Sequence, residues 1–307
     1  MLRYLLSRLG QAAIILIGIS MITFLLIYLL PADPVRQIAG RSATPETVEL
    51  IRQQLGLHRP LWEQYASYLG QLLQGDLGRS YIQKTEVTAL VLSRLPATLE
   101  LMAGAIGLEL AIGLSAGIFA ARRRGRVSDR AVMVLAFTAV SAPQFVVGIL
   151  LLYVFAVELG WFPIGGYGTL AHLVLPALTL GMLGGGWYAR MTRSSLIDVL
   201  RRDYIVTAEA KGATPRRVLW VHALRNAALP LVAMVGLDIG IFMSGAVVVE
   251  SVYGWPGIGQ LAWQAIQRVD IPIIVGVTLV SAVAIMLGNL LADLLAPLID
   301  PRIKLRA

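Results

Sequence analysis

Residues 9–30 form an apolar stretch that contains no charged side chain. A helix needs roughly 20 apolar residues to cross the hydrocarbon core of a bilayer, so this stretch is long enough to span a membrane. Further apolar stretches follow at residues 97–120, 131–157, 172–188, 227–249 and 271–298. The sequence therefore predicts an all-α integral membrane protein with six transmembrane helices.

Two of these predicted spans contain residues that disturb a helix. Residues 141–143, which are Ser-Ala-Pro, interrupt the third span, because proline has no N–H to donate and frees backbone groups that a hinge or a path-lining bend could use. The fourth span is short and contains three consecutive glycines at 184–186. We expect these glycines either to loosen the helix or to serve packing alone.

The composition agrees with a membrane protein. Hydrophobic residues make up 57% of the chain and charged residues only 14%, too few to cover the surface of a soluble domain of this length. The absence of cysteine excludes disulfides, thiolate metal sites and a cysteine nucleophile. The three histidines show no metal-ligand spacing, so no metal site is expected.

The distribution of Lys and Arg predicts the orientation of the chain. Basic residues gather at the N-terminus, between spans two and three, between spans four and five, and in the C-terminal tail. The third connection has none and the fifth has only Arg268. By the positive-inside rule both termini are cytoplasmic. The net charge of +8 thus reports topology, and no nucleic-acid partner is needed to explain it.

The first span follows Arg3 and Arg8, as the apolar core of a signal peptide would. It is longer than such a core, and no small-residue cleavage site follows it. We therefore expect it to be a retained transmembrane helix.

Residues 31–95 are the only sizeable segment predicted outside the membrane on the outer side. Thr44 can cap a helix that begins at Pro45 and ends at Gly56, and Pro60 can open a second, amphipathic helix. These two helices suit either a plain cover over the bundle or a docking platform. Trp62 and Tyr65 are the docking candidates on the second helix.

The predicted cytoplasmic connection between spans four and five is the most informative segment. Asp203 is a suitable N-cap for a short helix, and Gly212 can supply the left-handed turn that ends it. Thr214 can then cap a second helix with Pro215 at its first position. Such a stiff element between two spans suits a soluble motor that pushes on the membrane helices. An interfacial helix on anionic lipid explains the spacing equally well.

The sequence of this connection resembles the "EAA" loop of importer permeases in the ATP-binding cassette (ABC) superfamily. The dipeptide, oligopeptide, glutathione and nickel branch is the most similar. The resemblance rests on residues 203–212 and 222–230, with further matches at 1–8, 30–34, 55–61, 75–78, 95–101, 255–259 and 300–303. The general motif has Glu six residues before the glycine, where this chain has Val206, and the gap from Gly212 to Leu229 is longer. Both departures are typical of the peptide branch.

The resemblance implies a type I ABC importer permease in the bacterial inner membrane, the first of the two permeases that such systems encode. Its expected partners are a second homologous permease, two ATPase subunits, an extracytoplasmic substrate-binding protein and the lipid bilayer. ATP and Mg²⁺ would be bound by the ATPases, and this chain lacks a GxxxxGK[ST] loop, so it is expected to bind no cofactor and to be no enzyme. The expected division is 1–30, 31–95 and a permease core at 96–307 that includes a coupling segment at 190–229.

The resemblance also assigns roles to particular residues. A coupling helix that sits in a cleft of one ATPase subunit would comprise Asp203, Tyr204, Thr207, Ala208, Glu209, Ala210, Lys211 and Gly212. The turn at 253–257 and the amphipathic stretch 258–268 suit a surface helix on the outer side. Trp255 and Gln260 are its candidates for contact with the binding protein.

Charged residues inside the spans are candidates for the translocation path. Asp238 lies in the middle of the fifth span, where an unpaired carboxylate costs roughly 2.5–3.5 kcal/mol. It is expected either to face the path and meet a substrate amine, or to pair with a polar group of a neighbouring helix. Glu109 and Asp293 are further candidates, as are Ser141 and Pro143 at the interruption of the third span.

Three alternatives stay open at this point. Residues 113–117 match the GxSxG pattern of a serine hydrolase, which would make Ser115 the nucleophile of an intramembrane protease, but they equally match the GxxxG pattern of close helix packing. A secondary transporter would need no ATPase. Within the ABC reading, di- or oligopeptides or glutathione are the expected solutes, with nickel or another small solute as the alternative.

Overall fold

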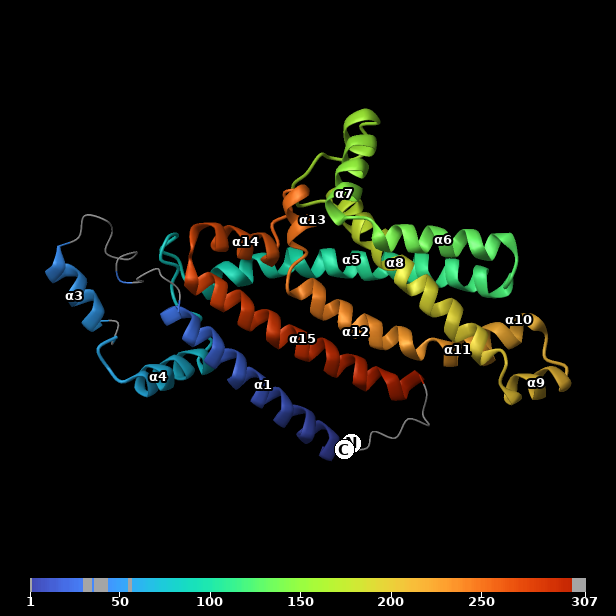
Figure 1. Cartoon of the computed structure of the whole chain (residues 1–307), viewed down its shortest axis with the longest axis horizontal. Helices are drawn as coiled ribbons and strands as arrows, with labels where there is room; N and C mark the ends of the chain where they lie inside the picture. The colour runs from blue at the N-terminus through green and yellow to red at the C-terminus, as the bar shows by residue number, and fades with distance from the viewer. Residues whose placement is uncertain (1, 30–34, 36–43, 55–56, 300–307) are drawn as a thin grey trace.

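The computed structural model describes residues 2–29, 35, 44–54 and 57–299. Apart from an isolated bridge between Arg79 and Glu86, the regular structure in these ranges is helical. The four longest helices are α1 (Leu2–Leu29), α5 (Val87–Arg122), α8 (Leu170–Val199) and α15 (Ile271–Ile299). They run roughly along the long axis of the molecule (Figure 1).

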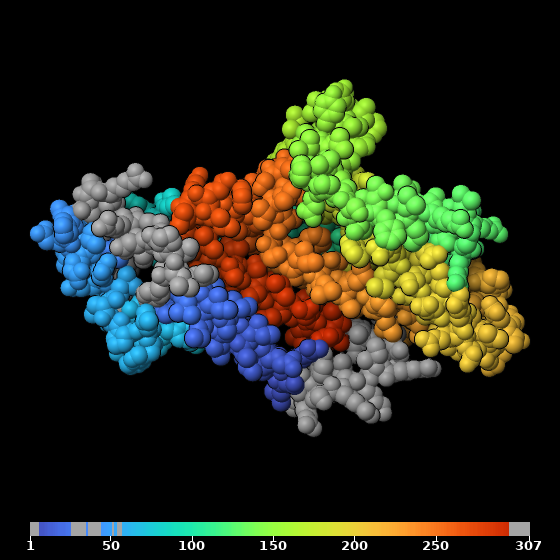
Figure 2. Space-filling model, in the orientation of Figure 1, coloured from blue at the N-terminus to red at the C-terminus, as the bar shows by residue number. Residues whose placement is uncertain are grey.

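These four helices are long and apolar enough to cross a membrane. Two bent helix pairs within the described ranges raise the number of candidate spans to as many as six, if each pair is one span. The first pair joins α6 (Val127–Ser141) to α7 (Gln144–Leu152) and the π-helix η1 (Tyr153–Glu158), with a bend of 100°. The predicted interruption at Ser141–Pro143 is therefore confirmed, because Pro143 cannot continue the hydrogen-bond ladder. Figure 2 shows α7 and η1 projecting from the body.

The second bent pair follows the predicted coupling segment. It consists of α10 (Pro215–Arg217), η2 (Val218–Ala223) and α11 (Leu224–Ala227), followed after a bend of 46° by α12 (Leu229–Met243). A proline in the first turn of α12, Pro230, accounts for the break at this point.

The three consecutive glycines do not loosen the fourth span, because α8 runs through them without a break. They let neighbouring helices come close. A Cβ atom on Gly184 would lie 1.8 Å from the Glu109 carboxylate, and one on Gly186 would lie 2.5 Å from the carbonyl oxygen of Ala136. The packing alternative is therefore the correct one.

The GxxxG pattern on α5 also allows close packing against α8, and we call this α5–α8 contact the seam. A Cβ atom on Gly113 would lie 2.1 Å from Cβ of Tyr188, and one on Gly117 would lie 2.5 Å from Cβ of Thr192. Ser115 faces away and donates a hydrogen bond to the carbonyl oxygen of Ala111 at 2.7 Å. The structure thus supports helix packing rather than a nucleophile at residues 113–117.

The outer segment contains α3 (Pro45–Gln54) and α4 (Leu61–Leu73). The Thr44 hydroxyl accepts a hydrogen bond from the N–H of Thr47 at 3.3 Å, as expected for a cap. The hydroxyl groups of Tyr65 on α4 and Ser20 on α1 lie 2.9 Å apart, so α4 is fixed against the first span. The predicted end of α3 at Gly56 lies outside the described residues.

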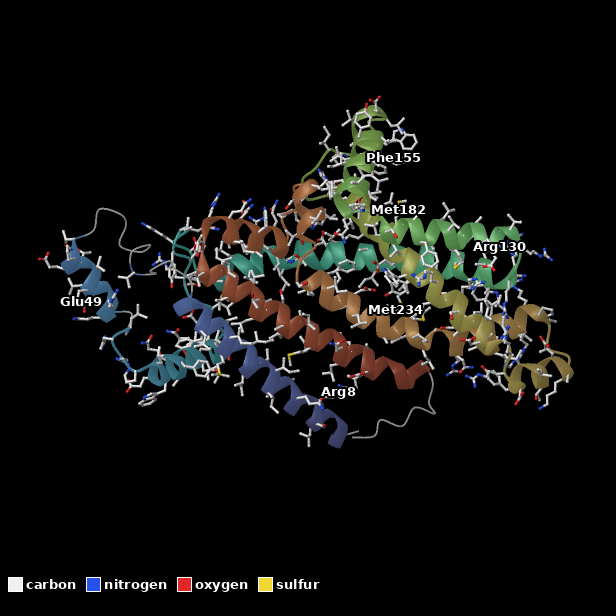
Figure 3. All side chains as sticks on the ribbon, viewed as in Figure 1. Arg8, Glu49, Arg130, Phe155, Met182 and Met234 are labelled. Atoms are coloured by element: carbon white, nitrogen blue, oxygen red, sulfur yellow. The ribbon has the colours of Figure 1, made fainter. Side chains whose placement is uncertain are left out.

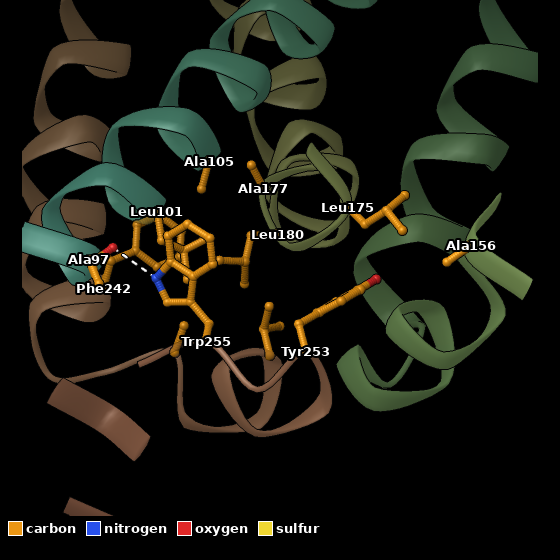
Figure 4. Close-up of a cluster of buried hydrophobic side chains, with 12 residues drawn as sticks. Ala97, Leu101, Ala105, Ala156, Leu175, Ala177, Leu180, Phe242, Tyr253 and Trp255 are labelled. Atoms are coloured by element: carbon orange, nitrogen blue, oxygen red, sulfur yellow. Dashed lines mark hydrogen bonds between the residues drawn. The ribbon is translucent and has the colours of Figure 1, made fainter. Parts of the chain in front are cut away.

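The chain between α12 and α15 forms α13 (Val247–Val252) and α14 (Ile258–Arg268). The turn between them inserts Trp255 into the core formed by α5, α8 and α12 (Figure 4). Its indole N–H donates to the carbonyl oxygen of Ala97 at 2.8 Å. This turn therefore anchors α14 to α5 at Ala97.

Candidate functional site

The predicted coupling helix is α9 (Asp203–Ala210), at the end of the molecule opposite α3 and α4 (Figure 1). We call this end the α9 end. Gly212 adopts φ +83°, which confirms the left-handed turn, and among the described residues beyond its chain neighbours no atom lies within 4 Å of the place a Cβ would occupy. Thr214 accepts a hydrogen bond from the N–H of Arg217 at 3.3 Å, with Pro215 at the first helical position, as predicted.

The predicted N-cap of α9 is wrong by one residue. Arg202 occupies the cap position without a side-chain hydrogen bond, and Asp203 is the first helical residue. A carboxylate at that position still interacts favourably with the positive end of the helix dipole. The start of α9 is therefore stabilised by charge rather than by a capping hydrogen bond.

Packing on one side fixes the position of α9. Ile205 is buried in a cluster with Leu196 of α8 and Leu219 and Ala223 of η2. The Tyr204 hydroxyl accepts a hydrogen bond from the side-chain amide of Asn226 at 3.1 Å. The predicted coupling residues are otherwise at the surface: Asp203, Tyr204, Thr207, Glu209, Ala210, Lys211 and Gly212 are exposed and Ala208 is partly so. The helix is therefore packed against α8 and η2 on one side and exposes a polar face on the other.

An ion pair that the sequence analysis missed ties α8 to α6 near the same end. Arg193 donates to the Asp129 carboxylate at 2.5 and 2.7 Å, and the N–H of Gly125 donates to the same carboxylate at 2.9 Å. Figure 3 shows Arg130, the neighbour of Asp129, at this end of α6. The sequence contains no signal for this pair, because its members lie 64 residues apart.

The structure brings two of the predicted path residues together inside the bundle. The Asp238 and Glu109 carboxyl groups are close enough for their charges to interact. The Tyr188 hydroxyl donates to Oδ2 of Asp238. Glu109 is only 3% exposed, and its Oε2 atom has no hydrogen-bond partner among the described residues. A polar cluster therefore joins α5, α8 and α12 in the apolar region.

This cluster bears on the two alternatives for Asp238. Its contact with Tyr188 is the pairing that a structural role requires, whereas its partial exposure leaves it accessible from the surface. Tyr188 was not singled out from the sequence, although a tyrosine buried in an apolar helix needs a hydrogen-bond partner.

The remaining path candidates lie elsewhere. Asp293 forms an ion pair with Arg8 of α1 at 2.8 Å and is not part of the polar cluster. Ser141 and Pro143 are exposed at the bend between α6 and α7. Ser141 borders an open hollow of about 440 Å³, whose other lining residues are Phe137, Thr138 and Ala142.

The four docking candidates differ in accessibility. Trp62 is 70% exposed on α4, and Tyr65 is held partly buried against α1. The side chain of Trp255 is fully buried, so the expectation that it contacts a binding protein is not met. Gln260 is partly exposed, and its side-chain oxygen accepts a hydrogen bond from Arg94 at 3.5 Å.

Glu250 is a further acidic residue that the sequence analysis did not use. It is fully buried and accepts a hydrogen bond from the N–H of Gln260 at 2.6 Å, near the start of α14. Burial raises the pKa of this carboxyl group to about 7. The Glu250 carboxyl group thus helps to hold the start of α14.

The comparisons with known proteins cover nearly the whole chain. Residues 113–305 match the family described as "Binding-protein-dependent transport system inner membrane component". Residues 1–102 match "Binding-prot-dependent transport system membrane comp, N-term". The "Glutathione transport system permease protein GsiC" of Escherichia coli (strain K12) is 41% identical over 304 residues, which cover 99% of each chain. Its counterpart in Shigella flexneri serotype 5b (strain 8401) is 40% identical with the same coverage.

A solved structure shows the same fold. A chain of the MetNI methionine ABC transporter, described in inward-facing conformations, superposes with a TM-score of 0.58 at 19% identity. The match covers 68% of this chain and 96% of that one. The chain therefore belongs to the binding-protein-dependent transport system inner membrane components, and it is a multi-pass ABC importer permease subunit rather than an enzyme.

Proposed function

We propose that this chain forms part of the membrane path of an ATP-driven importer for di- and oligopeptides and glutathione-like solutes. The relatives at 40–41% identity over 99% of the chain are named as glutathione permeases, which supports this class of solute. The partners in the proposal are a second homologous permease, two ATPase subunits and an extracytoplasmic binding protein. This chain supplies one half of the path and one of the two contacts with the ATPases.

The observation that carries the proposal is the geometry of α9. Ile205 and the left-handed turn at Gly212 fix the helix, while Asp203, Glu209 and Lys211 stay accessible to a protein partner. A movement of α9 is transmitted to α8 and η2 through shared apolar packing, and from there to α12. This continuity is what a coupling helix requires.

The orientation in the proposal places the α9 end, and both termini of the chain, in the cytoplasm. The arginine-rich turn between α5 and α6, at residues 122–130, lies at the same end as α9 (Figure 1). The helices α3 and α4 lie at the other end and belong to the outer side, where the exposed Trp62 is available to a binding protein. The positive-inside rule supports this assignment.

The path in the proposal passes the bend at Ser141 and Pro143 and the polar cluster of Glu109 and Asp238. Backbone groups freed at a helix break inside a membrane must face protein or water. The open hollow beside Ser141 supports such a surface. Asp293 is left out, because its pairing with Arg8 gives it a structural role.

The test is uptake into proteoliposomes that contain this chain with its partner permease and ATPases. Glutathione and a dipeptide, each added with the cognate binding protein, should accumulate against a gradient only when ATP is supplied. Uphill transport by this chain alone would contradict the need for ATPases. ATP-driven uptake of nickel with neither glutathione nor dipeptide would overturn the proposed solute class.

A further inference from the structure

One face of α4 is fixed against the first candidate span. The hydroxyl groups of Tyr65 and Ser20 lie 2.9 Å apart, and the Tyr65 hydroxyl donates to the carbonyl oxygen of Ile17 at 3.3 Å. The ring centre of Phe24 lies 5.3 Å from that of Tyr65 and 5.7 Å from that of Tyr68. These contacts hold α4 beside the C-terminal half of α1 (Figure 1).

The same contacts place α4 at the depth of the apolar spans. The candidate span of α1 is Leu6–Leu25, so Ser20 and Ile17 lie about 8 and 12 Å before its end, at 1.5 Å per residue. Tyr68 of α4 also packs against the first turns of α15, whose candidate span begins at Ile271. A helix that lies in a membrane interface buries its apolar face about 5–10 Å into the boundary between headgroups and acyl chains. The position of α4 agrees with that depth.

A second face of α4 is apolar and exposed. Trp62, Ala66 and Leu73 lie on it, because spacings of four and seven residues return to the same side of a helix. Trp62 is 70% exposed, Leu73 is 90% exposed, and Ala66 is exposed as well. Exposed apolar residues are common on protein surfaces, but these three lie beside the membrane-spanning part of α1. We call these three residues the apolar face of α4.

The third face of α4 is polar. Glu63, Ser67 and Gln71 recur at every fourth residue, and Ser67 and Gln71 are exposed. At 3.6 residues per turn, the apolar face lies between this polar face and the side that carries Tyr65 and Tyr68. A helix at the edge of a membrane needs this order, with the bundle on one side, lipid on the next and water on the third.

The apolar face of α4 also continues a surface of α1 that suits lipid. Within the candidate span of α1, Met21 is 53% exposed and Ile22 is 61% exposed. Figure 2 shows α1 and α4 next to each other on the same face of the molecule. Trp62 adds an indole ring at one end of α4, and tryptophan is enriched where membranes meet water.

We propose that α4 lies in the membrane interface and that its apolar face, Trp62, Ala66 and Leu73, binds the lipid of one leaflet. This inference goes beyond the proposed function and takes from it only the name of the leaflet, which is the outer one. It assigns Trp62 to lipid. A binding protein or the second permease on the same face is a competing outcome of the experiment below.

The experiment measures the surroundings of single spin labels. The chain contains no cysteine, so one introduced cysteine carries the only label on it. The permease–ATPase complex with Ala66→Cys or Leu73→Cys is labelled in nanodiscs of phosphatidylethanolamine and phosphatidylglycerol. The complex with the unsubstituted chain gives the background from the partner subunits. Electron paramagnetic resonance then measures collisions of the label with oxygen, which concentrates in lipid, and with a water-soluble nickel chelate. Both variants leave Trp62 in place.

Matched controls come from the polar face of the same helix. Ser67→Cys and Gln71→Cys are exposed positions close to the two test positions in the chain. We expect the ratio of oxygen to nickel collisions to be several-fold higher at Ala66 and Leu73 than at these controls. It should approach the ratio at Met21→Cys in the span of α1. Equal ratios on the two faces of α4 would overturn the proposal.

Two further arms separate the other occupants of this face. Protection of Ala66 and Leu73 from both reagents in the complex alone would assign the apolar face to the second permease. Protection that appears only after the binding protein is added would assign it to that protein, and either result would overturn the proposal. Uptake in the complete system is measured separately. Uptake with equal ratios overturns only this inference, and absent uptake with high ratios at both positions overturns only the proposed function.

Discussion

The seam between α5 and α8 and the coupling segment around α9 are held together in opposite ways. In the seam, Gly113, Gly117 and Gly184 bring helices so close that no side chain fits. In the predicted coupling segment, a Cβ atom on Gly212 would meet no other described residue within 4 Å, and only the backbone angle requires glycine. The seam glycines therefore set the distance between two helices, whereas Gly212 sets the direction in which the chain continues. The comparison indicates a rigid pair of spans beside an element that is held on one side and has an accessible outer face.

The largest effect should come from filling the seam. Gly113→Val would place a side chain 2.1 Å from Cβ of Tyr188 and against the α8 backbone, which cannot move without separating the helices. We expect destabilisation by more than ~3 kcal/mol and loss of monodisperse protein. The measurement is the yield and thermal midpoint of the detergent-solubilised chain. Gly107→Val on the same helix is the control, because nothing lies within 4 Å of its Cβ position.

At the coupling segment, the same substitution should affect function and spare the fold. Gly212→Val meets no neighbour but must adopt φ +83°, which a β-branched residue does at a cost of about 1–2 kcal/mol. We expect uptake to fall about tenfold while ATP hydrolysis continues and the thermal midpoint stays near that of the wild type. Gly212→Asn, which tolerates this conformation, should retain most uptake. Unimpaired uptake in Gly212→Val would remove the coupling role.

The polar cluster allows a smaller and sharper test. If Asp238 serves the path, Asp238→Ala should lower ATP-driven uptake several-fold without preventing assembly, since the carboxylate itself is used. Tyr188→Phe removes only the hydrogen bond to Asp238 and should have a weaker effect. Equal losses in the two variants would show that Asp238 acts only as the partner of Tyr188.

The smallest expected effect concerns pH and Glu250. Its pKa is raised to about 7 by burial, so the folded protein binds this proton more tightly than the unfolded chain does. The resulting stability is fully present below the ordinary carboxyl pKa and is lost as pH rises through about 7. We expect the thermal midpoint to fall by a few degrees between pH 5 and pH 8. Glu250→Gln should flatten this change, and an unchanged slope in that variant would assign it to other groups.

The pattern of apolar stretches predicted six spans, and the described residues contain four helices long enough to cross a membrane, or as many as six if each bent pair is one span. The break at Ser141–Pro143 was predicted correctly, because proline chemistry is a local property. The left-handed turn at Gly212 and the Thr214 cap were predictable for the same reason. For the path residues, the sequence predicts the candidates but not their partners. An acidic residue in an apolar helix can be found in the sequence, but nothing in the sequence shows that Glu109 meets Asp238 while Asp293 meets Arg8.

The sequence by itself determined which segments enter the membrane, where the chain turns, and the family to which it belongs. Those properties follow from hydrophobicity, from the backbone preferences of glycine and proline, and from motifs that are local in the chain. Only the tertiary structure decided that the three glycines of α8 serve packing and that Trp255 is buried. It also decided that the guanidinium of Arg190 lies near the rings of Phe137 and Trp187. The physical reason is that helix faces meet across long sequence separations, and burial or pairing is a property of the faces that meet.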